Sequence, residues 1–474
     1  MPTQDNIQDV TVNSLSIRSA IATFDIEPFL VELNIEESLF KTSLTGSIVL
    51  ADSYNIPEKF PIVGEETVNI DISLAGLDGR ADETFYTIKP PPMHINSISG
   101  RFFSKPKAQV FTLELVSEQY MSNIHSKVSR SYNDYLISDM VTDIYYNYLG
   151  DEDKTRPFRV EPTNQTESLI IPNLSPLEAI KWLTKRAIQV DGNGVNYLFF
   201  ETLSGPRFVS LNKLSENESF FRYRLSARLD DPTGVENLAV GIQRINKIYF
   251  MGQFDKVDNA INGLYSSKLV THDIVRKKIT QHDFNGYNNF VGLNHAGTFP
   301  TISSSNVETK SSEVPRTSFA PADDENAFPI STEKDLSSMT DSHVVFYPKH
   351  NQLYAKNKSD LYDNKVEEWK LQRTSQIKSY DNITFIIEVA GNSLIRVGQI
   401  ITIDIPSPES TDADKSSGDY FDKFLSGNYM ITAIKHVFHK VEAKDNKITY
   451  TMKIEVVKDA LEDLVANRTS RKDI

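Results

Sequence analysis

The ten residues VGEETVNIDI at 63–72 guide the interpretation of this 474-residue chain, because a similar stretch, VGQIITIDI, returns at 397–405. In both stretches a Val-Gly pair precedes a run in which apolar and polar residues alternate. Side chains of a β-strand point alternately to the two faces of a sheet, so each run predicts a strand with one buried face. The shared Val-Gly pair and the shared alternation indicate that one structural module occurs twice.

Two later features repeat in the same order. Each copy has a methionine that opens a strand, Met93 and Met430, and a last strand in which threonine follows an aromatic residue, FTLEL at 111–115 and YTMKI at 450–454. Between these features each copy places an isoleucine and then a phenylalanine, namely Ile98, Phe102, Ile434 and Phe438. Equal order and nearly equal spacing predict a duplicated module. The alternative is that alternating strands resemble one another without duplication.

Alternation extends on both sides of the first copy. Phe29, Val31, Leu33 and Ile35 are apolar and polar residues separate them, so residues 1–118 are predicted to form a first β-barrel domain. Residues 219–285 and 350–459 are predicted to form the second. That second domain includes a helix whose one face carries Tyr362, Val366 and Trp369. The shared fold should cover about 24–116 and about 380–458.

The segment between the two modules has a different pattern. Ser131 and Asp134 are candidate caps of a helix with Leu136, Met140, Ile144 and Tyr148 on one face. Ser175-Pro176 is a good N-cap and first-turn pair for a second helix. A strand at 197–201 follows, then a turn at Gly205-Pro206 and another strand. Residues 119–218 are therefore predicted to be an inserted α+β domain.

Two regions lack strong periodicity. Residues 286–349 are rich in Ser, Pro, Asn and Asp, which predicts a long loop or insertion that orders against a neighbouring protein. Residues 460–474 are predicted to be a C-terminal tail with a short amphipathic start at Leu461 and Leu464. No span of 18 apolar residues occurs and the N-terminus has no secretory pattern, so no membrane insertion is expected.

Composition excludes several function classes. The net charge is −14, from 50 Lys and Arg against 64 Asp and Glu, which argues against a dedicated DNA-binding surface. The chain has no cysteine, so disulfides, thiolate metal sites and cysteine nucleophiles are excluded. The absence of cysteine also fits assembly in a cytosol.

Short motifs that resemble catalytic or binding motifs fail on inspection. Gly192-Asn193-Gly194 lacks the third glycine of a dinucleotide fingerprint and leads into a strand. Asp412, Asp414 and Ser416 begin like a calcium loop, but Lys423 stands where a bidentate glutamate is required. The pairs His272-Asp273 and His282-Asp283 are isolated, and His436 and His439 are three apart on a strand and so face opposite sides. We therefore predict no catalytic, cofactor-binding or metal-ligating residue and no cofactor.

Three segments together resemble a known family. The first is 29–72, with Glu36-Glu37-Ser38-Leu39-Phe40, Leu44-Thr45-Gly46, a turn at Asp52 and Val63-Gly64-Glu65-Glu66. The second is Leu174-Ser175-Pro176 with Ala179-Ile180 and Leu183, followed by 197–201. The third is 425–432 (LSGNYMIT) with His436. These patterns resemble central baseplate hub proteins of contractile-tailed phages of the T-even type, whereas residues 286–349 match nothing in that family.

The resemblance implies a mainly β fold with two similar tube-protein-like β-barrel domains, an inserted α+β domain and a long loop. It also implies a non-enzymatic homotrimer in the virion tail baseplate, assembled in the cytoplasm of the bacterial host. The trimer would adapt a three-fold central spike to the six-fold tail tube and leave a channel for the genome. The implied partners are the spike protein, tail tube or tube-initiator proteins, the tape-measure protein, and DNA that passes without specific binding.

Two other functions stay open. One is the hub portion of a spike in a bacterial contractile secretion or injection system, which would normally continue into a spike. The other is a tail-associated glycan hydrolase, which needs an acid and a base that no pair of residues in this chain singles out. Turnover of peptidoglycan by the purified protein distinguishes the hydrolase from a structural hub.

Overall fold

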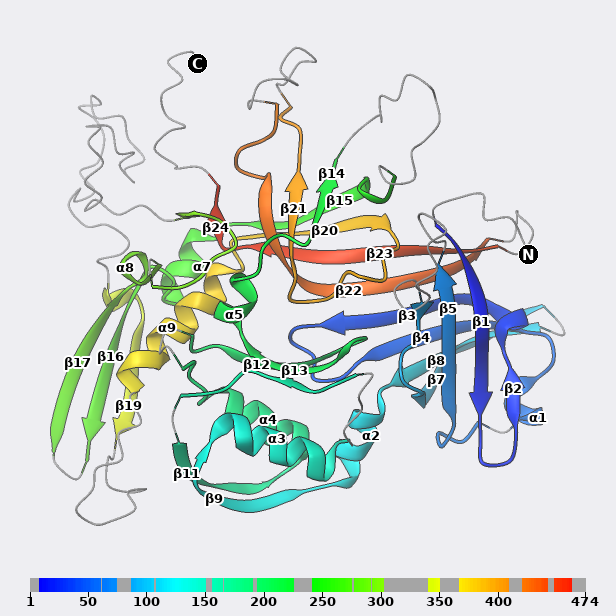
Figure 1. Ribbon diagram of the computed structural model, residues 1–474, viewed down its shortest axis with the longest axis horizontal. Helices are drawn as coiled ribbons and strands as arrows, with labels where there is room; N and C mark the ends of the chain where they lie inside the picture. The colour runs from blue at the N-terminus through cyan, green and yellow to red at the C-terminus, as the bar shows by residue number, and fades with distance from the viewer. Residues whose placement is uncertain are drawn as a thin grey trace.

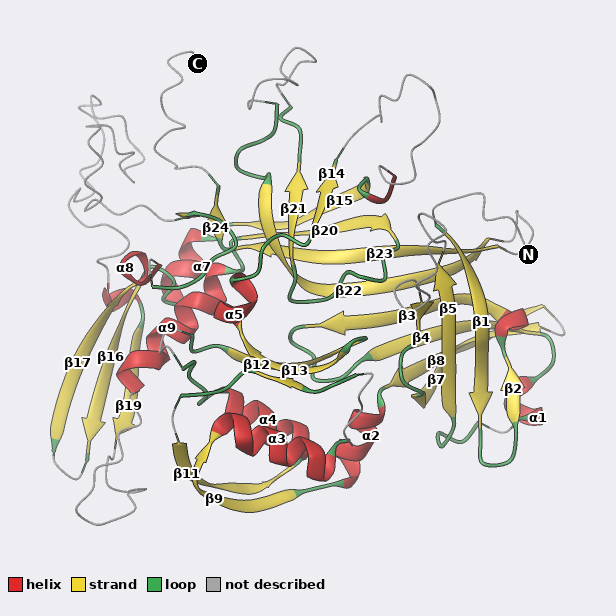
Figure 2. Ribbon diagram, in the orientation of Figure 1, coloured by secondary structure: helices red, strands yellow, loops and turns green. Residues whose placement is uncertain are grey.

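A computed structural model of the chain describes residues 8–60, 62–74, 87–105, 108–150, 156–164, 166–190, 194–225, 241–274, 277–290, 292–301, 340–349, 366–408, 420–441 and 447–462. Its dominant feature is a 14-stranded sheet, accompanied by a three-stranded and a two-stranded sheet in the insert and by two small sheets elsewhere (Figures 1 and 2). The mainly β fold class predicted from the sequence is confirmed.

The first half of the large sheet is built from the N-terminal region. Its strands pair in the order β3-β4-β8-β7-β5-β1, and the short strands β2 and β6 pair with β1 and β5. The bounds are β1 Asp9–Arg18, β2 Thr23–Asp25, β3 Leu30–Ser38, β4 Thr45–Asp52, β5 Thr67–Leu74, β6 Thr87–Ile88, β7 Met93–Lys105 and β8 Ala108–Val116, with the short helices η1 Glu27–Phe29 and α1 Ile56–Lys59. Alternating residues of β4, β5 and β8 are buried, as their sequences predict.

The second half of the sheet repeats this pairing order. Its strands follow as β15-β20-β23-β22-β21-β14. The bounds are β14 Phe221–Arg224, β15 Ile245–Gln253, β20 Ile383–Ala390, β21 Ile400–Asp404, β22 Gly427–Val441 and β23 Lys447–Lys458. Five strands therefore correspond one to one: β3 to β15, β4 to β20, β8 to β23, β7 to β22 and β5 to β21. The last strand differs, because β14 pairs parallel with β21 whereas β1 pairs antiparallel with β5.

Residues at corresponding positions of the two halves behave alike. Gly64 and Gly398, each in a Val-Gly pair, have φ values of 98° and 81°. That left-handed region is adopted readily by glycine, which explains why both copies carry it there. Met93 and Met430 are both completely buried. A shared strand order and shared local conformations agree with the duplication hypothesis, while the domain boundaries stay a prediction.

The two halves are joined edge to edge. Strand β3 pairs antiparallel with β22 over seven residue pairs, from Ser38 opposite Ala433 to Glu32 opposite His439. Strand β1 also pairs with β23 at Asp9 and Val10. As a result, one hydrophobic core runs through both halves.

The inserted domain lies beside the sheet, at the bottom of Figure 1. Its elements are α2 Glu118–His125, β9 Val128–Leu136, α3 Ile137–Tyr148, β10 Arg159–Val160, β11 Thr166–Leu174, α4 Pro176–Thr184, β12 Tyr197–Thr202, β13 Gly205–Ser210 and α5 Leu211–Ser215. It has its own core, in which α3 and α4 contribute Met140, Ile144, Ile180 and Leu183.

Three details of this domain can be compared with the sequence prediction. Helix α4 begins as predicted, because Pro176 is in its first turn and the Glu178 carboxylate accepts a hydrogen bond from the Ser175 N–H (3.1 Å). The predicted caps of the preceding helix are wrong: Ser131 and Asp134 lie inside β9 and α3 starts after Leu136. Cross-strand pairing of β9 with β11 overrides the local capping preference of these residues. The turn predicted at Gly205-Pro206 falls instead at 203–204, because Gly205 and Pro206 already belong to β13.

A third group of elements flanks the insert at the left of Figure 1. Strands β16 Ser266–Asp273, β17 Lys278–Asn285 and β19 Val344–Lys349 form a separate sheet in the order β17-β16-β19. Around it lie α7 Lys256–Ile261, α8 Gly286–Phe290, η3 Thr340–Ser342 and α9 Val366–Ser379, while β18 Phe299–Pro300 pairs with β24 Ala460–Leu461.

These elements correct the expectation of a continuous loop at 286–349 and of a tail from 460. Residues 344–349 form β19, whose parallel partner β16 is about 75 residues earlier in the chain, so no local hairpin signal marks it. Residues 460–461 form β24, and Leu464 and residues 302–339 are outside the described part. Tyr362 is also outside it, whereas Val366 and Trp369 lie in α9 as predicted. No helix among the described residues is long and apolar enough to span a membrane.

Candidate assembly interface

A buried glutamate connects the first half of the sheet to the insert. Glu37 on β3 is 1% exposed, and its Oε1 accepts a hydrogen bond from the backbone N–H of Leu203 at 3.0 Å. Leu203 lies in the tight turn between β12 and β13, and β12 packs against β3. A buried carboxylate that accepts a backbone N–H forms a strong, charge-assisted hydrogen bond.

A second glutamate makes the reciprocal connection. Glu201, the next-to-last residue of β12, is 2% exposed and its Oε2 accepts from the Leu44 N–H at 3.0 Å. Its Oε1 accepts from Arg156 Nη2 at 3.1 Å, and the same guanidinium group donates to the Thr202 carbonyl. Each domain therefore contributes one carboxylate and one backbone N–H to the contact, which fixes the relative position of the two domains.

The second half of the sheet supplies the remaining groups around Glu37. His436 on β22 is fully buried, with its Nε2 3.7 Å from Glu37 Oε1, longer than a hydrogen bond. Arg396 Nε lies 3.9 Å from the same oxygen and donates to Ser204 Oγ at 3.1 Å. Three parts of the chain that are distant in sequence thus meet at one carboxylate.

The ionisation of this cluster follows from burial and neighbouring charge. Burial alone would raise the pKa of Glu37, but His436, Arg396 and the Leu203 N–H outweigh it and hold this pKa below its usual value. Burial lowers the pKa of His436, against the opposing effect of Glu37 and with a contribution from Arg396. His436 is therefore neutral at pH 7 and Glu37 is charged. Burial also raises the pKa of Tyr450, whose hydroxyl lies 2.8 Å from His436 Nδ1 and stays protonated.

The cluster has the chemistry of a structural junction. Its two carboxylates and His436 are buried, and the charge of Glu37 is balanced by Arg396, whose side chain is 13% exposed. None was predicted as a site residue, but a signal was present. Alternation along β3 places residue 37 on the same face as Leu33 and Ile35, and alternation along β12 places residue 201 with Tyr197 and Phe199. A glutamate at a position reserved for apolar residues indicates a specific buried partner.

The exposed surface offers a different kind of site at the edge strand β15. This strand is the last in the pairing order of the sheet. It pairs with β20, and Arg244, just before β15, makes one bridge to Arg224 of β14. Within the described residues no strand pairs with the rest of its outer edge. Its Tyr249, Phe250 and Met251 are 47%, 55% and 64% exposed, and Phe254 just beyond is 59% exposed. An exposed apolar edge strand is a template for pairing with another chain.

A second free edge lies on β7. This strand pairs with β8 along its length, but on its other edge it meets β5 only at Met93 and His94. From residue 97 onward that edge has no partner strand in the described part of the chain. Phe102 and Phe103 there are 57% and 79% exposed.

These two free edges correspond to the two edges that join the halves. Within the chain β3 pairs with β22, and the counterparts of β3 and β22 in the other half are β15 and β7. The edges of β15 and β7 that correspond to the paired edges of β3 and β22 therefore have no partner strand among the described residues. We call the exposed edge of β15 at 245–253 the β15 edge, and that of β7 at 97–105 the β7 edge.

The histidines considered as metal ligands do not converge. His436 is buried and His439 has a half-exposed side chain, so the two face opposite sides of β22 as predicted. His272 pairs with Ile279, and His282 pairs with Leu269, so they are not opposite each other across β16 and β17. Among described residues, no group of three or more His, Asp or Glu side chains could hold a metal ion. Residues 192–193 and 412–416 are outside the described part.

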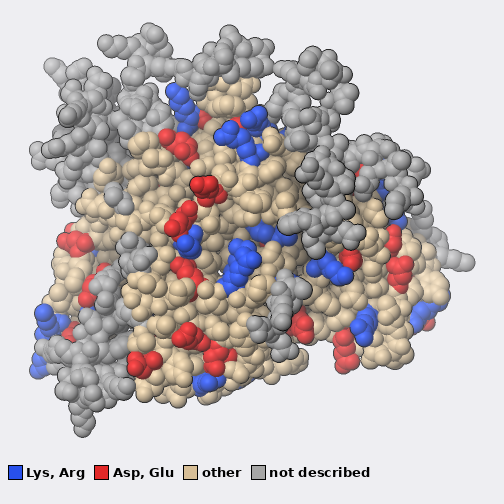
Figure 3. All heavy atoms as spheres, viewed as in Figure 1, with Lys and Arg blue, Asp and Glu red and all other residues tan. Residues whose placement is uncertain are grey.

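Charge on the visible surface is mixed. On the face in Figure 3, basic and acidic side chains are interspersed, and no continuous basic stripe crosses the described residues in that view. A nucleic-acid groove would need such a stripe to neutralise successive phosphates. This face therefore lacks the features of a nucleic-acid interface.

Comparison with known proteins supports the resemblance seen in the sequence. No family model matches the chain. The chain is 23% identical over 447 residues to a probable baseplate hub protein, gp334, of Vibrio phage KVP40, and the match covers 92% of this chain and 93% of the phage protein.

A solved structure adds the fold. A tail protein from Neisseria meningitidis MC58 superposes with a TM-score of 0.50 at 9% identity, covering 94% of this chain and 96% of that one. The 43 kDa tail protein of prophage MuSo2 from Shewanella oneidensis gives a TM-score of 0.48 at 9% identity, covering 95% and 99%. The resemblance to baseplate hub proteins is confirmed: this chain is a relative of a phage baseplate hub protein and has the fold of a phage tail protein.

Proposed function

We propose that this chain is a structural hub of a phage tail baseplate that works as a homotrimeric ring. The ring adapts a three-fold central spike to the six-fold tail tube and leaves a channel for the genome. The hub role rests on the phage relative, and the ring rests on one observation. The β15 and β7 edges are the free counterparts of the edges that β3 and β22 pair within the chain.

The ring follows from repeating that internal contact between chains. If the β15 edge of one copy pairs antiparallel with the β7 edge of the next, each neighbouring contact has the geometry of the contact between halves. Such a contact is heterologous, because two different edges meet. Repeating it produces a closed ring when the rotation from one chain to the next is a whole fraction of a full turn. With two similar halves per chain, three chains present six similar units to a six-fold tube.

Exposed side chains support this pairing. Tyr249, Phe250 and Met251 on the β15 edge and Phe102 and Phe103 on the β7 edge leave large apolar surfaces in water in the isolated chain. Burying them between copies stabilises the ring, at about 25 cal/mol per Å² of apolar surface. Exposed apolar edges otherwise favour uncontrolled association, so their pairing also removes that hazard.

The remaining parts of the proposal concern partners and location. The spike, the tail tube or its initiator and the tape-measure protein are the partners that such a ring would contact in the virion baseplate. The net charge of −14 suits a channel that DNA traverses without binding.

No catalytic step is assigned to the chain. Hydrolysis of cell-wall material, abolished by one carboxylate substitution in this chain, would contradict that assignment.

The ring can be tested with engineered disulfides, because the chain has no cysteine of its own. In the internal contact Glu36 lies opposite Lys435, and their charged groups are 3.5 Å apart. The corresponding positions are Tyr249 and Ser97, because Tyr249 pairs with Ile386 as Glu36 pairs with Thr45, and Ser97 pairs with Glu114 as Lys435 pairs with Lys453. The variant that combines Ser97→Cys with Tyr249→Cys should, on oxidation, form covalent dimers and trimers and then stop.

The outcomes separate three arrangements. A ladder that ends at the trimer supports the closed ring, whereas a ladder continuing to higher multimers indicates an open filament. Ser97→Cys with Ile170→Cys is the matched control, because Ile170 is 71% exposed on β11, away from both edges. Cross-linking no stronger than in this control would contradict the pairing, and two or six copies per ring in the intact particle would refute the trimer.

A further inference from the structure

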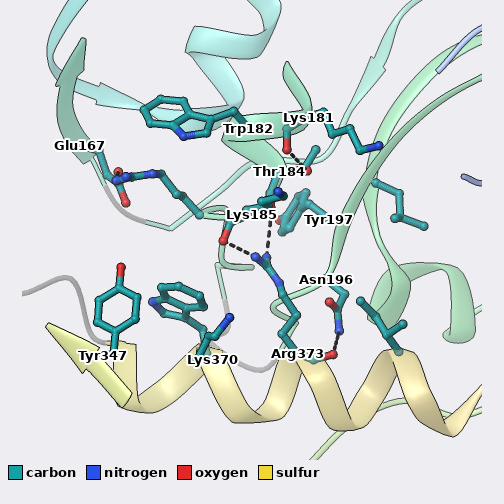
Figure 4. A pocket seen from close by; sticks show the side chains of 14 residues that line it. Glu167, Lys181, Trp182, Thr184, Lys185, Asn196, Tyr197, Tyr347, Lys370 and Arg373 are labelled. Carbon is teal, nitrogen blue, oxygen red and sulfur yellow. Dashed lines mark hydrogen bonds and ion pairs between the residues drawn. The ribbon is translucent and has the colours of Figure 1, made fainter. Parts of the chain in front are cut away.

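A cavity of about 540 Å³ lies between the insert and the flanking group, lined by α4, the start of β12, β19 and α9. Its described lining contains Trp182 and Trp369, the only two tryptophans of the chain. Figure 4 shows Trp182 on one side and Tyr347, Lys370 and Arg373 on the other, facing a common space. A cavity of this volume is within the usual range for ligand sites of proteins.

The charge of the cavity is opposite to that of the chain. Five cationic residues line it, Lys181, Lys185, Arg186, Lys370 and Arg373, against the single carboxylate Glu167. Such an excess of cationic side chains in one cavity is unusual in a chain of net charge −14. Glu167 is also occupied, because it lies 3.5 Å from Arg186 Nη1. The cavity therefore presents excess positive charge beside aromatic surfaces.

The two arginines are committed to the protein itself. Arg373 donates to the carbonyls of Val195, Thr184 and Lys185, and its guanidinium group lies 5.5 Å from the Trp369 ring. Arg186 stacks 4.6 Å from the Trp182 ring. These contacts fix the indole rings as walls of the cavity. Burial lowers the pKa of Arg373 to about 10, so it stays charged at pH 7.

The three lysines are the available charges. Among the described residues, no carboxylate lies within ion-pair distance of Lys181, Lys185 or Lys370. Lysines present point charges rather than the planar fork with which arginine holds phosphate. A neutral glycan would stack on tryptophan without needing three cations. An extended single strand of nucleic acid needs a groove that follows its backbone, whereas this cavity is a local hollow between α4 and α9.

We infer that this cavity is a docking site for an acidic peptide segment of a partner protein, which places a flat apolar side chain between Trp182 and Trp369 and its carboxylates near Lys181, Lys185 and Lys370. Aromatic stacking supplies the apolar contact, and the carboxylates restore charge balance in the partly buried site. The inference is independent of the ring contact, because none of these residues belongs to the β15 or β7 edges.

Tryptophan fluorescence reports directly on this site, since both tryptophans line it. The probe is acetyl-Glu-Phe-Glu-Glu-amide, whose phenylalanine does not contribute to the tryptophan signal. We expect a saturable change in emission that weakens as salt is added. The neutral peptide acetyl-Gln-Phe-Gln-Gln-amide should bind roughly tenfold more weakly or worse. Trp182→Phe and Trp369→Phe should each remove part of the signal.

Charge reversal tests the lysines. The triple variant Lys181→Glu, Lys185→Glu and Lys370→Glu should lose binding of the acidic peptide, and the corresponding triple Gln variant should lose it in part. Lys181 and Lys185 are exposed and Lys370 is half-buried, so thermal melting should show both variants folded. Saturable binding unaffected by the triple Glu variant would overturn the inference. Equal binding of the neutral peptide, tighter binding of oligothymidylate or chitooligosaccharide, or no saturation at millimolar peptide would also overturn it.

Discussion

Glu37 on β3 and Leu203 in the turn of the insert are 166 residues apart in sequence, yet the carboxylate of the first accepts the backbone N–H of the second at 3.0 Å. Glu201 and Leu44 make the same contact in the opposite direction. A backbone N–H does not depend on side-chain identity, so the specificity of this contact lies in the two glutamates. The insert is thereby held rigidly against the strand whose counterpart forms the proposed ring contact.

The first prediction concerns Glu201. Glu201→Ala removes the partner of Arg156, whose side chain is 11% exposed, and of the Leu44 N–H, so the free energy of unfolding should fall by about 3 kcal/mol. Urea denaturation followed by circular dichroism measures the loss. Glu216→Ala is the control, because Glu216 and its partner Lys213 are each 53% exposed and their ion pair should contribute less than about 1 kcal/mol. Equal effects of the two substitutions would contradict a structural role of the junction.

The second prediction concerns pH. Since burial lowers the pKa of His436, the unfolded chain takes up a proton before the folded one as pH falls below 6.5. The Glu37 pKa is also lowered, so a further loss of stability should begin as pH falls below 4.5. The melting temperature should therefore decrease in both windows. His436→Gln should flatten the upper window and leave the lower one, and an unchanged profile in this variant would contradict the assignment.

The third prediction uses the two repeated glycines as mutual controls. Alanine at either position must adopt a positive φ, which costs roughly 1 kcal/mol or more. At Gly398 an added Cβ would also lie 3.0 Å from Leu214 Cδ2, whereas at Gly64 the nearest atom is 3.9 Å away. Gly398→Ala should thus lower the midpoint of thermal unfolding more than Gly64→Ala. The reverse order would show that local packing at these positions is misjudged.

The fourth prediction addresses the ring edges. Phe103→Lys and Met251→Glu each place a charge where an apolar contact between copies is proposed, so either should shift trimers to monomers in light scattering. Both residues are more than half exposed, so the unfolding midpoint should stay nearly unchanged. Mixing the two variants should restore part of the association, because the unsubstituted β15 edge of one variant can then pair with the unsubstituted β7 edge of the other. Ile170→Lys should have no effect on the mass, and an equal loss in this control would exclude a specific contact.

The sequence predicted an element correctly where the residues that determine this element are close together in the chain. Alternation within β5, β8, β21 and β23 is read from neighbouring residues, and those strands form where predicted. The start of α4 is likewise local, because Ser175, Pro176 and Glu178 determine it within one turn. Ser131 and Asp134 misled the helix prediction, since pairing between β9 and β11 involves residues 30 to 46 positions apart.

The sequence by itself determined the β class and the order of the repeated features, because strand periodicity, the glycine that adopts positive φ and burial of Met93 and Met430 are properties of short segments. Only the tertiary structure decided which edges are used and which stay free. The pairing of β3 with β22 depends on where a chain of several hundred residues brings two strands together, and alternation carries no information about a strand's neighbours. The same holds for Glu37, whose unexpected place on a buried face became interpretable once Leu203, Arg396 and His436 were found around it.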